Sequence, residues 1–358
     1  GGDPIAAALA AGEIPSPEMV AASGEKEGLQ PRTAIACFVG VVLMLVALVL
    51  LSSKTTLLGR APLPLPPDAL AFKAREMLKQ FGYTEEPVDT AYGFAAGLDL
   101  SSYQRHLRSA NDFDHRWERL ASHQPALTVF WYRQHQDYLQ AGDFGGAGRV
   151  TKEDPPLDSR GMVRIMLNAN GLLDRLDGRP SQALSKTKGV LALAGPTGDW
   201  SRLLSAAGLE PGRFKPSQPG PETFLPVYAD SRMAWTGSYA DGRPETITVE
   251  AAALDGRPVF FRILGPWQKT AYNETRPLVR LAISAFFVLM VALLIAAGIV
   301  AWRNVRLGRG DTKAAWRIAA MLFATGVTSW ALASAHVPTT GEVTLLLMGL
   351  SAAAFQAG

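Results

Sequence analysis

Cysteine is almost absent from the sequence. Cys37 is the only cysteine among 358 residues, so the chain cannot form an internal disulfide. A disulfide framework and a thiolate-ligated zinc site are both excluded as ways of organising the fold. A folded core in this protein therefore has to come from the burial of apolar side chains.

Charge is also scarce, and its distribution is uneven. Only 19% of the residues are charged, against about a quarter in soluble proteins. Four stretches contain no Asp, Glu, Lys or Arg: residues 33–53, 281–302, 318–341 and 343–358. A membrane-spanning helix needs about 20 apolar residues, so the pattern excludes a purely soluble globular protein. The formal net charge of +3 is too small to indicate a nucleic-acid partner.

The uncharged stretches predict a multi-pass membrane protein. We expect membrane-spanning helices at residues 33–53, 281–302, 318–335 and, as a truncated span, 343–358. The link at residues 303–317 has five basic residues and one acidic residue. Short cationic loops stay on the cytoplasmic side of a membrane. This link and residues 1–32, a juxtamembrane tail, are thus predicted to be cytoplasmic, and residues 54–280 to be extracytoplasmic.

Residues 54–280 are predicted to form a folded α+β domain. They hold most of the charged residues and five of the eight tryptophans, a balance that can supply both a surface and a core. The segment is expected to be one domain or two modules with a boundary near residues 180–200.

Local patterns place helices in the first half of this segment. A helix is expected from Asp68, as N-cap, to a stop at Gly82. A second helix is expected over residues 101–122. Its buried set would be Leu107, Phe113, Trp117 and Leu120.

Strand patterns follow the helices and predict an antiparallel sheet. A short apolar strand is expected at residues 126–132, then a hairpin that turns at Asn170-Gly171. Three further runs, at 233–239, 246–254 and 258–264, are separated by Asp-Gly turns. Such a series of strands and tight turns is typical of an antiparallel meander.

Catalytic signatures are missing. The sequence contains no glycine-rich nucleotide loop, no Gly-x-Ser-x-Gly and no His-Glu-x-x-His. His106, His115, His123 and His135 are never three or four residues apart, so surface or packing roles are favoured over a metal site. We therefore predict no catalytic, cofactor-binding or metal-binding residue, and no cofactor, within this chain.

Three short motifs invite a functional interpretation. Asp143-Phe144-Gly145 matches the magnesium-binding tripeptide of kinases, but Trp117 follows His115-Arg116 where a kinase needs its catalytic Asp, so the match is interpreted as coincidence. Residues 130–133, Phe-Trp-Tyr-Arg, could line a binding groove; a half-buried strand with an exposed Arg133 is the favoured reading. Asn273-Glu274-Thr275 matches a glycosylation sequon that often arises by chance.

Five stretches carry a resemblance to one group of proteins. They are GGDPIAAALAAGEIPSPEMVAASGEKEG (1–28), PPDALAFKAREMLKQFGY (66–83), FWYRQHQDYL (130–139), DSRMAWTGSY (230–239) and VEAAALDGRPVFFRILGPW (249–267). Together they resemble the C-terminal membrane and extracytoplasmic region of bacterial serine/threonine protein kinases. The stretches are signatures of that group and bear no catalytic residues.

The resemblance implies a cytoplasmic kinase domain upstream of Gly1, where ATP and magnesium would bind, and a place in the bacterial inner membrane. The chain opens without an initiator methionine and is expected to be an internal piece of a longer polypeptide. The expected partners are the lipid bilayer and an unidentified extracytoplasmic ligand. A homodimer through the transmembrane helices is left open, and no nucleic acid is expected.

Two functions from different classes fit these observations. The first is a sensor that relays an outside signal to a cytoplasmic kinase domain. The alternative is an ABC-transporter-permease-like or mechanotransmission component, because one span, a large outer domain and three further spans also describe such proteins. A third idea, an outer hydrolase, is disfavoured by the missing nucleophile motif.

Overall fold

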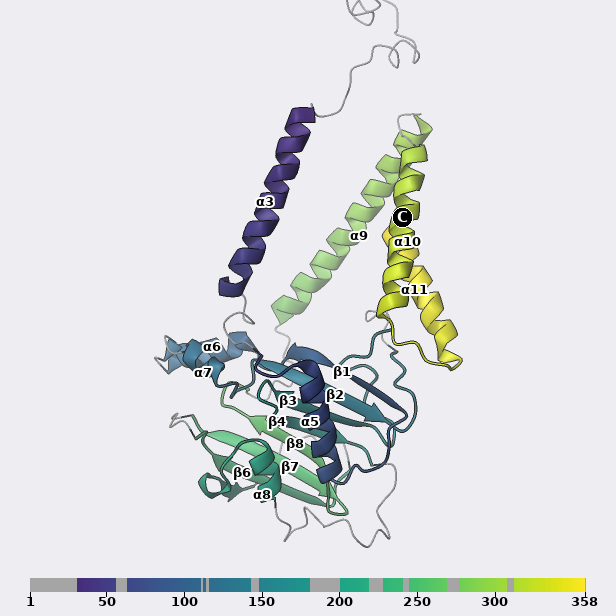
Figure 1. Ribbon diagram of the computed structural model, residues 1–358. Helices are drawn as coiled ribbons and strands as arrows, with labels where there is room; N and C mark the ends of the chain where they lie inside the picture. Colours follow the sequence, from purple (N-terminus) through teal and green to yellow (C-terminus); the bar gives the residue numbers. More distant parts are fainter. Residues whose placement is uncertain are drawn as a thin grey trace, which may run out of the picture. The chain divides into compact units, whose positions relative to one another are not determined.

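The computed structural model describes residues 31–55, 63–110, 112–113, 116–142, 148–180, 200–218, 228–240, 245–268, 277–307 and 312–357. The chain divides into two compact units, residues 1–62 and residues 63–358. The described part of the first unit is one helix, α3 (Pro31–Thr55). The other described helices and all the described strands belong to the second unit; Figure 1 shows the ribbon of the chain.

The second unit contains an eight-stranded sheet with helices before, between and after the strands. Its strands are β1 (Asp89–Ala96), β2 (Thr128–His135), β3 (Val163–Asn168), β4 (Leu173–Gly178), β5 (Lys215–Ser217), β6 (Ser231–Gly237), β7 (Ile247–Leu254) and β8 (Arg257–Leu264). Its helices are α5 (Pro67–Gln80), α6 (Leu100–Ser109), α7 (Arg116–Ala121), α8 (Ser201–Ala206), η3 (Pro211–Arg213), α9 (Pro277–Arg306), α10 (Thr312–Ala333) and α11 (Gly341–Ala357).

The sheet is antiparallel throughout, with the strand order β1-β2-β3-β4-β8-β7-β6-β5. The prediction of an α+β fold with an antiparallel sheet is confirmed. Strand β4 pairs with β8, so strands on both sides of residues 181–199 belong to one sheet. The join is short, from Arg175↔Arg262 to Asp177↔Phe260.

Both described tight turns follow from their sequences. Between β3 and β4 the amide of Gly171 donates to the carbonyl of Asn168 at 2.9 Å, with Gly171 at φ 77°. Between β7 and β8, Asp255 and Gly256 have φ values of 51° and 77°. Two successive positive φ values make the type I′ turn that matches the twist of paired strands. The predicted hairpin and this part of the meander are confirmed; the turn at 241–242 lies outside the described residues.

The two edge strands were not expected from the sequence. Strand β1 reads DTAYGFAA, and its Gly and Ala are poor strand formers. Strand β5 has three residues, including Pro216. Each takes its extended form from pairing with a neighbour, β2 for β1 and β6 for β5.

Helix α5 differs from its prediction at the start and agrees with it at the end. The N-cap is Pro66, and Asp68 lies in the first turn, where it accepts a hydrogen bond from the Tyr92 hydroxyl at 3.3 Å. Pro67 at the first helical position has a fixed φ that suits the helix. The helix therefore begins before Asp68 in the sequence. At the other end, Gly82 has φ 90° and Tyr83 N donates to Leu78 O at 2.9 Å. This Schellman pattern is the expected glycine stop.

The single helix expected over residues 101–122 is wrong, because α6 and α7 are separate helices. Helix α6 closes where the amide of Asp112 donates to the Leu107 carbonyl at 2.9 Å. Leu107 and Leu120 are buried as expected, and Phe113 is half-buried. The burial of Trp117 lies outside the described side chains.

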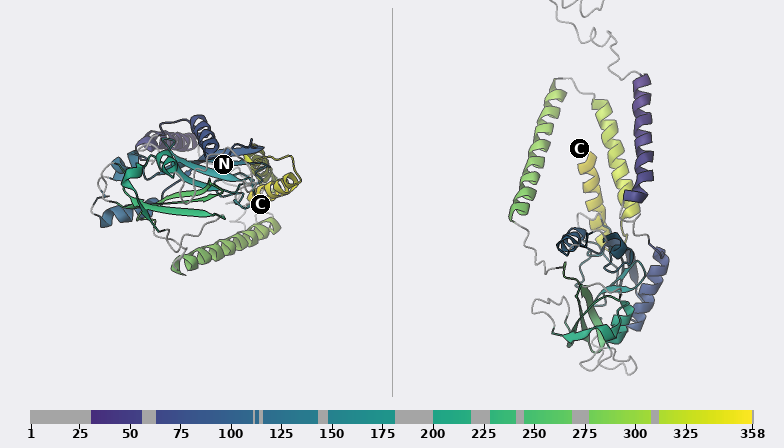
Figure 2. Two further views of the ribbon diagram at one scale, coloured as in Figure 1. Left: turned by 90° about the horizontal axis from the view of Figure 1, so that it is seen from below. Right: turned by 90° about the vertical axis from the view of Figure 1, so that its left-hand side faces the viewer.

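Helix α5 covers one face of the sheet (Figures 1 and 2). It buries Leu70, Ala74 and Leu78 completely, over strands β2 and β3. Phe130 and Ile165 are also fully buried. At about 1.5–3 kcal/mol for each large apolar side chain, this layer is a main source of stability for a domain without disulfides.

Among the residues that the structure describes, two helices are long and apolar enough to cross a membrane. The segments are Arg32–Leu51 in α3 and Ser284–Arg306 in α9. The third expected span lies in α10 and the fourth in α11, a shorter apolar helix, and these two spans stay predictions. Helix α9 runs on to Arg306, so Arg303 and Arg306 lie in its last turn rather than in a loop. Arginine is a good helix former, which explains this extension beyond the apolar run.

Candidate functional site

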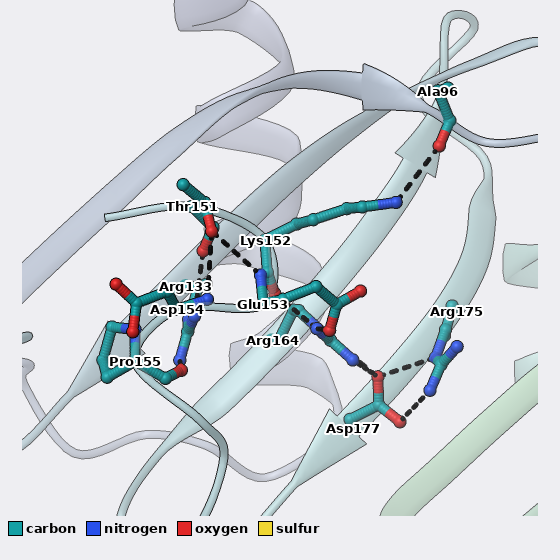
Figure 3. Close-up of polar contacts among 10 residues, drawn as sticks. All are labelled: Ala96, Arg133, Thr151, Lys152, Glu153, Asp154, Pro155, Arg164, Arg175 and Asp177. Carbon is teal, nitrogen blue, oxygen red and sulfur yellow. Dashed lines mark hydrogen bonds and ion pairs between the residues drawn. The ribbon is translucent and has the colours of Figure 1, made fainter. Parts of the chain in front are cut away.

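The sheet face opposite α5 carries a row of buried charges. Arg133, Arg164 and Asp177 are direct cross-strand partners on β2, β3 and β4, and each is at least 96% buried. Figure 3 shows the segment 151–155 lying over these side chains. Buried charges are costly unless they are paired, so their partners decide what this row can do.

Ion pairs join Arg164 and Asp177 of this row to each other and to Glu153 and Arg175. Arg164 donates to one oxygen of Asp177 from Nη2 at 2.8 Å and from Nε at 3.2 Å. Arg175 donates to the same carboxylate, and Arg164 Nη1 reaches Glu153 at 2.8 Å. Burial alone would lower the pKa of Arg164, but Asp177 and Glu153 outweigh it and the pKa is raised. Arg164 therefore stays charged at any physiological pH.

Arg133 is fully buried, and among the described residues its guanidinium donates to backbone carbonyls. Its guanidinium donates to the carbonyl of Thr151 at 2.9 Å and to that of Pro155 (Figure 3). Burial, helped by the nearby Arg164, lowers the pKa of Arg133 to about 10. The exposed arginine expected here is wrong, because the segment 151–155 covers the strand end.

The same burial corrects the idea of a recognition groove at residues 130–133. Phe130 and Tyr132 face the α5 side, and Trp131 packs with Met166 and Val129 on the other side. None of the four side chains is free to meet a ligand. We assign this region a structural role, because the charged row binds residues 151–155 to the sheet.

A pocket lies at one end of the sheet, where β2 and β4 end and β3 and β8 begin. It is lined by residues from five separate segments: Tyr83, Glu85, Pro87, Gln134, His135, Gln136, Gly161, Pro180 and Arg257. Most of these side chains are polar.

Arg257 is the central charged group of the pocket. It is 97% buried, and its guanidinium lies 5.1 Å from the centre of the Tyr83 ring. Its carboxylate partner is Glu85 at 3.5 Å, a side chain that is 41% exposed. The Tyr83 hydroxyl donates to Pro258 O at 2.9 Å, and burial strongly raises the pKa of Tyr83, so it stays neutral.

Two buried nitrogens in the pocket wall have no hydrogen-bond partner among the described residues. They are Nε of Arg257 and Nδ1 of His135. The other ring nitrogen of His135, Nε2, lies 3.1 Å from the Arg160 carbonyl. Buried donors and acceptors are almost always paired in folded proteins, so two unpaired nitrogens on residues that line one pocket make this pocket a candidate binding site.

The histidines expected to be surface or packing residues are spread over the sheet domain. His123 and His135 are buried and His106 is half-buried, with its ring 5.8 Å from that of Trp267. Within the described residues no three His, Cys, Asp or Glu side chains group as metal ligands. His115, Asp143-Phe144-Gly145 and Asn273-Glu274-Thr275 fall on side chains that the structure does not describe.

No protein-family model, curated protein or solved structure matches this chain. The pocket is therefore characterised by its own chemistry. Sequence reasoning did not find Tyr83 or Arg257 as site residues, because they lie 174 positions apart and belong to no catalytic or ligand-binding motif. The only sequence signal was His135, which was interpreted as a packing residue.

Proposed function

We propose that this chain is the membrane-anchoring and extracytoplasmic sensor portion of a bacterial transmembrane serine/threonine protein kinase. The observation that carries the proposal is the order along the chain. A sheet domain with its own core and a polar pocket lies, in chain order, between α3 and α9, two helices that are long and apolar enough to cross a membrane.

The charge pattern supports placing the sheet domain outside the cell. A chain that crosses at both helices leaves residues 54–280 on one side and the residues after α9 on the other. Arg303 and Arg306 end α9, and three more basic residues follow before residue 318. Because basic flanks stay in the cytoplasm, the sheet domain would be extracytoplasmic.

A contact near the turn between α10 and α11 supports the same topology. The amide of Ala335 donates to the carbonyl of Gly148 at 2.9 Å, and Gly148 also lies against Ser334 and Leu345. Gly148 belongs to the segment between β2 and β3. A turn that touches this segment has to lie on the same side of the membrane, as expected if α10 and α11 are the third and fourth spans.

Signal relay would then be a shift between two packings of the spans. A ligand that binds one state of the outer domain more tightly moves the equilibrium by the ratio of its two affinities. The Gly148–Ala335 contact gives the outer domain a direct route to the α10–α11 pair. A kinase domain upstream of residue 1 would respond through α3.

Reporter fusions test the topology. A reporter active only in the cytoplasm and one active only outside it are each fused after Gly171 and after Gly310. We expect an outside signal at Gly171, in the β3–β4 turn, and a cytoplasmic signal at Gly310. The same compartment for both positions would contradict the proposed topology.

A second experiment tests the kinase assignment independently. The coding region upstream of Gly1 is sequenced, and the complete protein is assayed in membrane vesicles for phosphorylation of serine or threonine. Activity that requires the upstream region is expected. A very short upstream region without a kinase catalytic loop would overturn the assignment and favour the permease-like alternative.

A further inference from the structure

Arg257 is buried with less carboxylate compensation than Arg164 of the charged row. Arg164 has two carboxylates at 2.8 Å, whereas Arg257 has a single carboxylate at 3.5 Å and an unpaired Nε. A buried guanidinium is stabilised only by close, hydrogen-bonded partners. The pocket at Arg257 is therefore electrostatically incomplete, and the missing group is an anion.

The shape of the guanidinium narrows the class of anion. Arginine presents parallel N–H groups in one plane, which match the two oxygens of a carboxylate. Glu85 approaches Nη2 of Arg257 and leaves Nε free. A carboxylate that reached both nitrogens would make the two-bond pair that Glu85 does not make.

His135 adds a second requirement. Its Nε2 faces the Arg160 carbonyl at 3.1 Å, and a carbonyl only accepts, so Nε2 is the donor and, in the tautomer with one proton, Nδ1 is unprotonated. Nδ1 is then an acceptor, and it has no donor among the described residues. A ligand that pairs with both Nε of Arg257 and Nδ1 of His135 must carry a hydroxyl or ammonium donor as well as a carboxylate.

The pocket also limits the size of the ligand. With Glu85 beside Arg257, the enclosed space holds at most about one water molecule. A ligand therefore has to take the place of the Glu85 carboxylate. Glu85 is able to leave, because its side chain is 41% exposed and its ion pair is long.

We propose that the pocket of Tyr83, Glu85, His135 and Arg257 binds a small α-hydroxy or α-amino carboxylate. The ligand carboxylate pairs with Arg257, its hydroxyl or ammonium group donates to Nδ1 of His135, and Glu85 moves out to solvent. Glu85 thus occupies the anion position in the empty site and competes with the ligand. The role of this ligand as a signal rests on the proposed function; its binding does not.

The binding test uses the full chain in lipid nanodiscs and isothermal titration calorimetry. Glycolate is the probe, and acetate, which has the same carboxylate but lacks the hydroxyl, is the matched control. We expect saturable binding of glycolate and about tenfold weaker binding of acetate, the ordinary value of one well-placed hydrogen bond in a buried site. Glycine is the second probe and reports on the ammonium form of the donor.

Two variants with matched controls test the geometry. Arg257→Lys keeps the charge and loses the planar pair of donors, so glycolate should bind at least about tenfold more weakly. Arg262→Lys, on the same strand and paired with Glu250, is its control and should bind normally. Glu85→Gln removes the competing carboxylate and should tighten binding about three- to tenfold. Glu76→Gln, paired with Lys79 on α5, is the control for this change.

The outcomes separate this site from the proposed function. No saturable binding of glycolate or glycine, equal binding of glycolate and acetate, or weaker binding by Glu85→Gln would each overturn the proposal. Glu85→Gln alters an exposed side chain and remains decisive if Arg257→Lys does not fold. Glycolate binding by a protein without an upstream kinase would uphold the site and leave only the kinase assignment wrong.

Discussion

Arg164 on β3 and Asp177 on β4 are direct cross-strand partners, joined by two hydrogen bonds to one carboxylate oxygen. Their side chains are 5% and 2% exposed. Glu153 and Arg175 complete the set from the covering segment and from β4. The pair therefore links two central strands to residues 151–155. Its loss should lower the stability of the whole sheet domain.

Asp177→Asn should destabilise the domain strongly, because it leaves the Arg164 charge buried without its main partner. Removing one member of a buried pair costs about 3–5 kcal/mol. We expect the melting temperature of the chain in detergent, measured by circular dichroism, to fall by about 10 °C. Glu210→Gln is the control: its pair with Arg213 is exposed, and the change should be within about 0.5 kcal/mol. Equal effects of the two substitutions would contradict the assigned role.

Asp174 should make stability depend on pH between about pH 4 and pH 6. Burial raises the pKa of Asp174 to about 6, with Arg175 acting in the opposite direction. A raised carboxyl pKa favours the protonated fold, so this contribution is present below about pH 4 and is lost as the pH rises through about 6. Asp174→Asn should therefore stabilise the domain at pH 7.5 and change little at pH 4.

The size of the Asp174 effect should be modest. The side chain is only partly buried, so we expect about 1 kcal/mol at pH 7.5, or a few degrees in melting temperature. The measurement is a pair of melts, wild type and variant, at each pH. A gain of the same size at both pH values would show that titration of Asp174 is not its cause.

Asp99 should have the opposite pH dependence. It caps α6 by accepting bonds from the amides and hydroxyls of Ser101 and Ser102, which lower the pKa of Asp99 to about 2. Its contribution is present above about pH 4 and is lost as the pH falls through about 2. Asp99→Ala should cost about 1 kcal/mol at pH 7, whereas Asp99→Ser keeps a cap and should cost less. Urea melts compare the two variants.

Residues 62–275 should fold alone as a soluble domain. The sheet buries a continuous apolar layer, and about 200 residues can bury roughly 70% of their unfolded surface without disulfides. Circular dichroism should show mixed helix and strand, and a cooperative melt that reductant does not change. A fragment that is unfolded, or soluble only in detergent, would show that the domain depends on the spans.

Local chemistry made part of this structure predictable. The Asn170-Gly171 and Asp255-Gly256 turns demand positive φ values, and each joins strands that are neighbours in sequence. The Gly82 stop and the apolar stripe of α5 involve residues within a few turns of one another. The uncharged runs in α3 and α9 are likewise contained in single segments. In each case the deciding interactions lie within about 20 residues, so the pattern is visible in the sequence.

Long-range pairing decided the rest. The sequence of β1, DTAYGFAA, has a low strand propensity, and β1 is extended because it pairs with β2. Arg133 is buried because residues 151–155 accept hydrogen bonds from its guanidinium. No local pattern reports a hydrogen bond such as that from Tyr83 to Pro258, across 175 positions.

The sequence by itself determined the apolar helices, the tight turns and the antiparallel character of the domain, because neighbouring residues set φ, hydropathy and pairing direction. Only the tertiary structure decided the sheet order and the pocket around Arg257. Bringing residues 83, 135 and 257 together requires the complete sheet, whose ends collect side chains from segments that share no local signal.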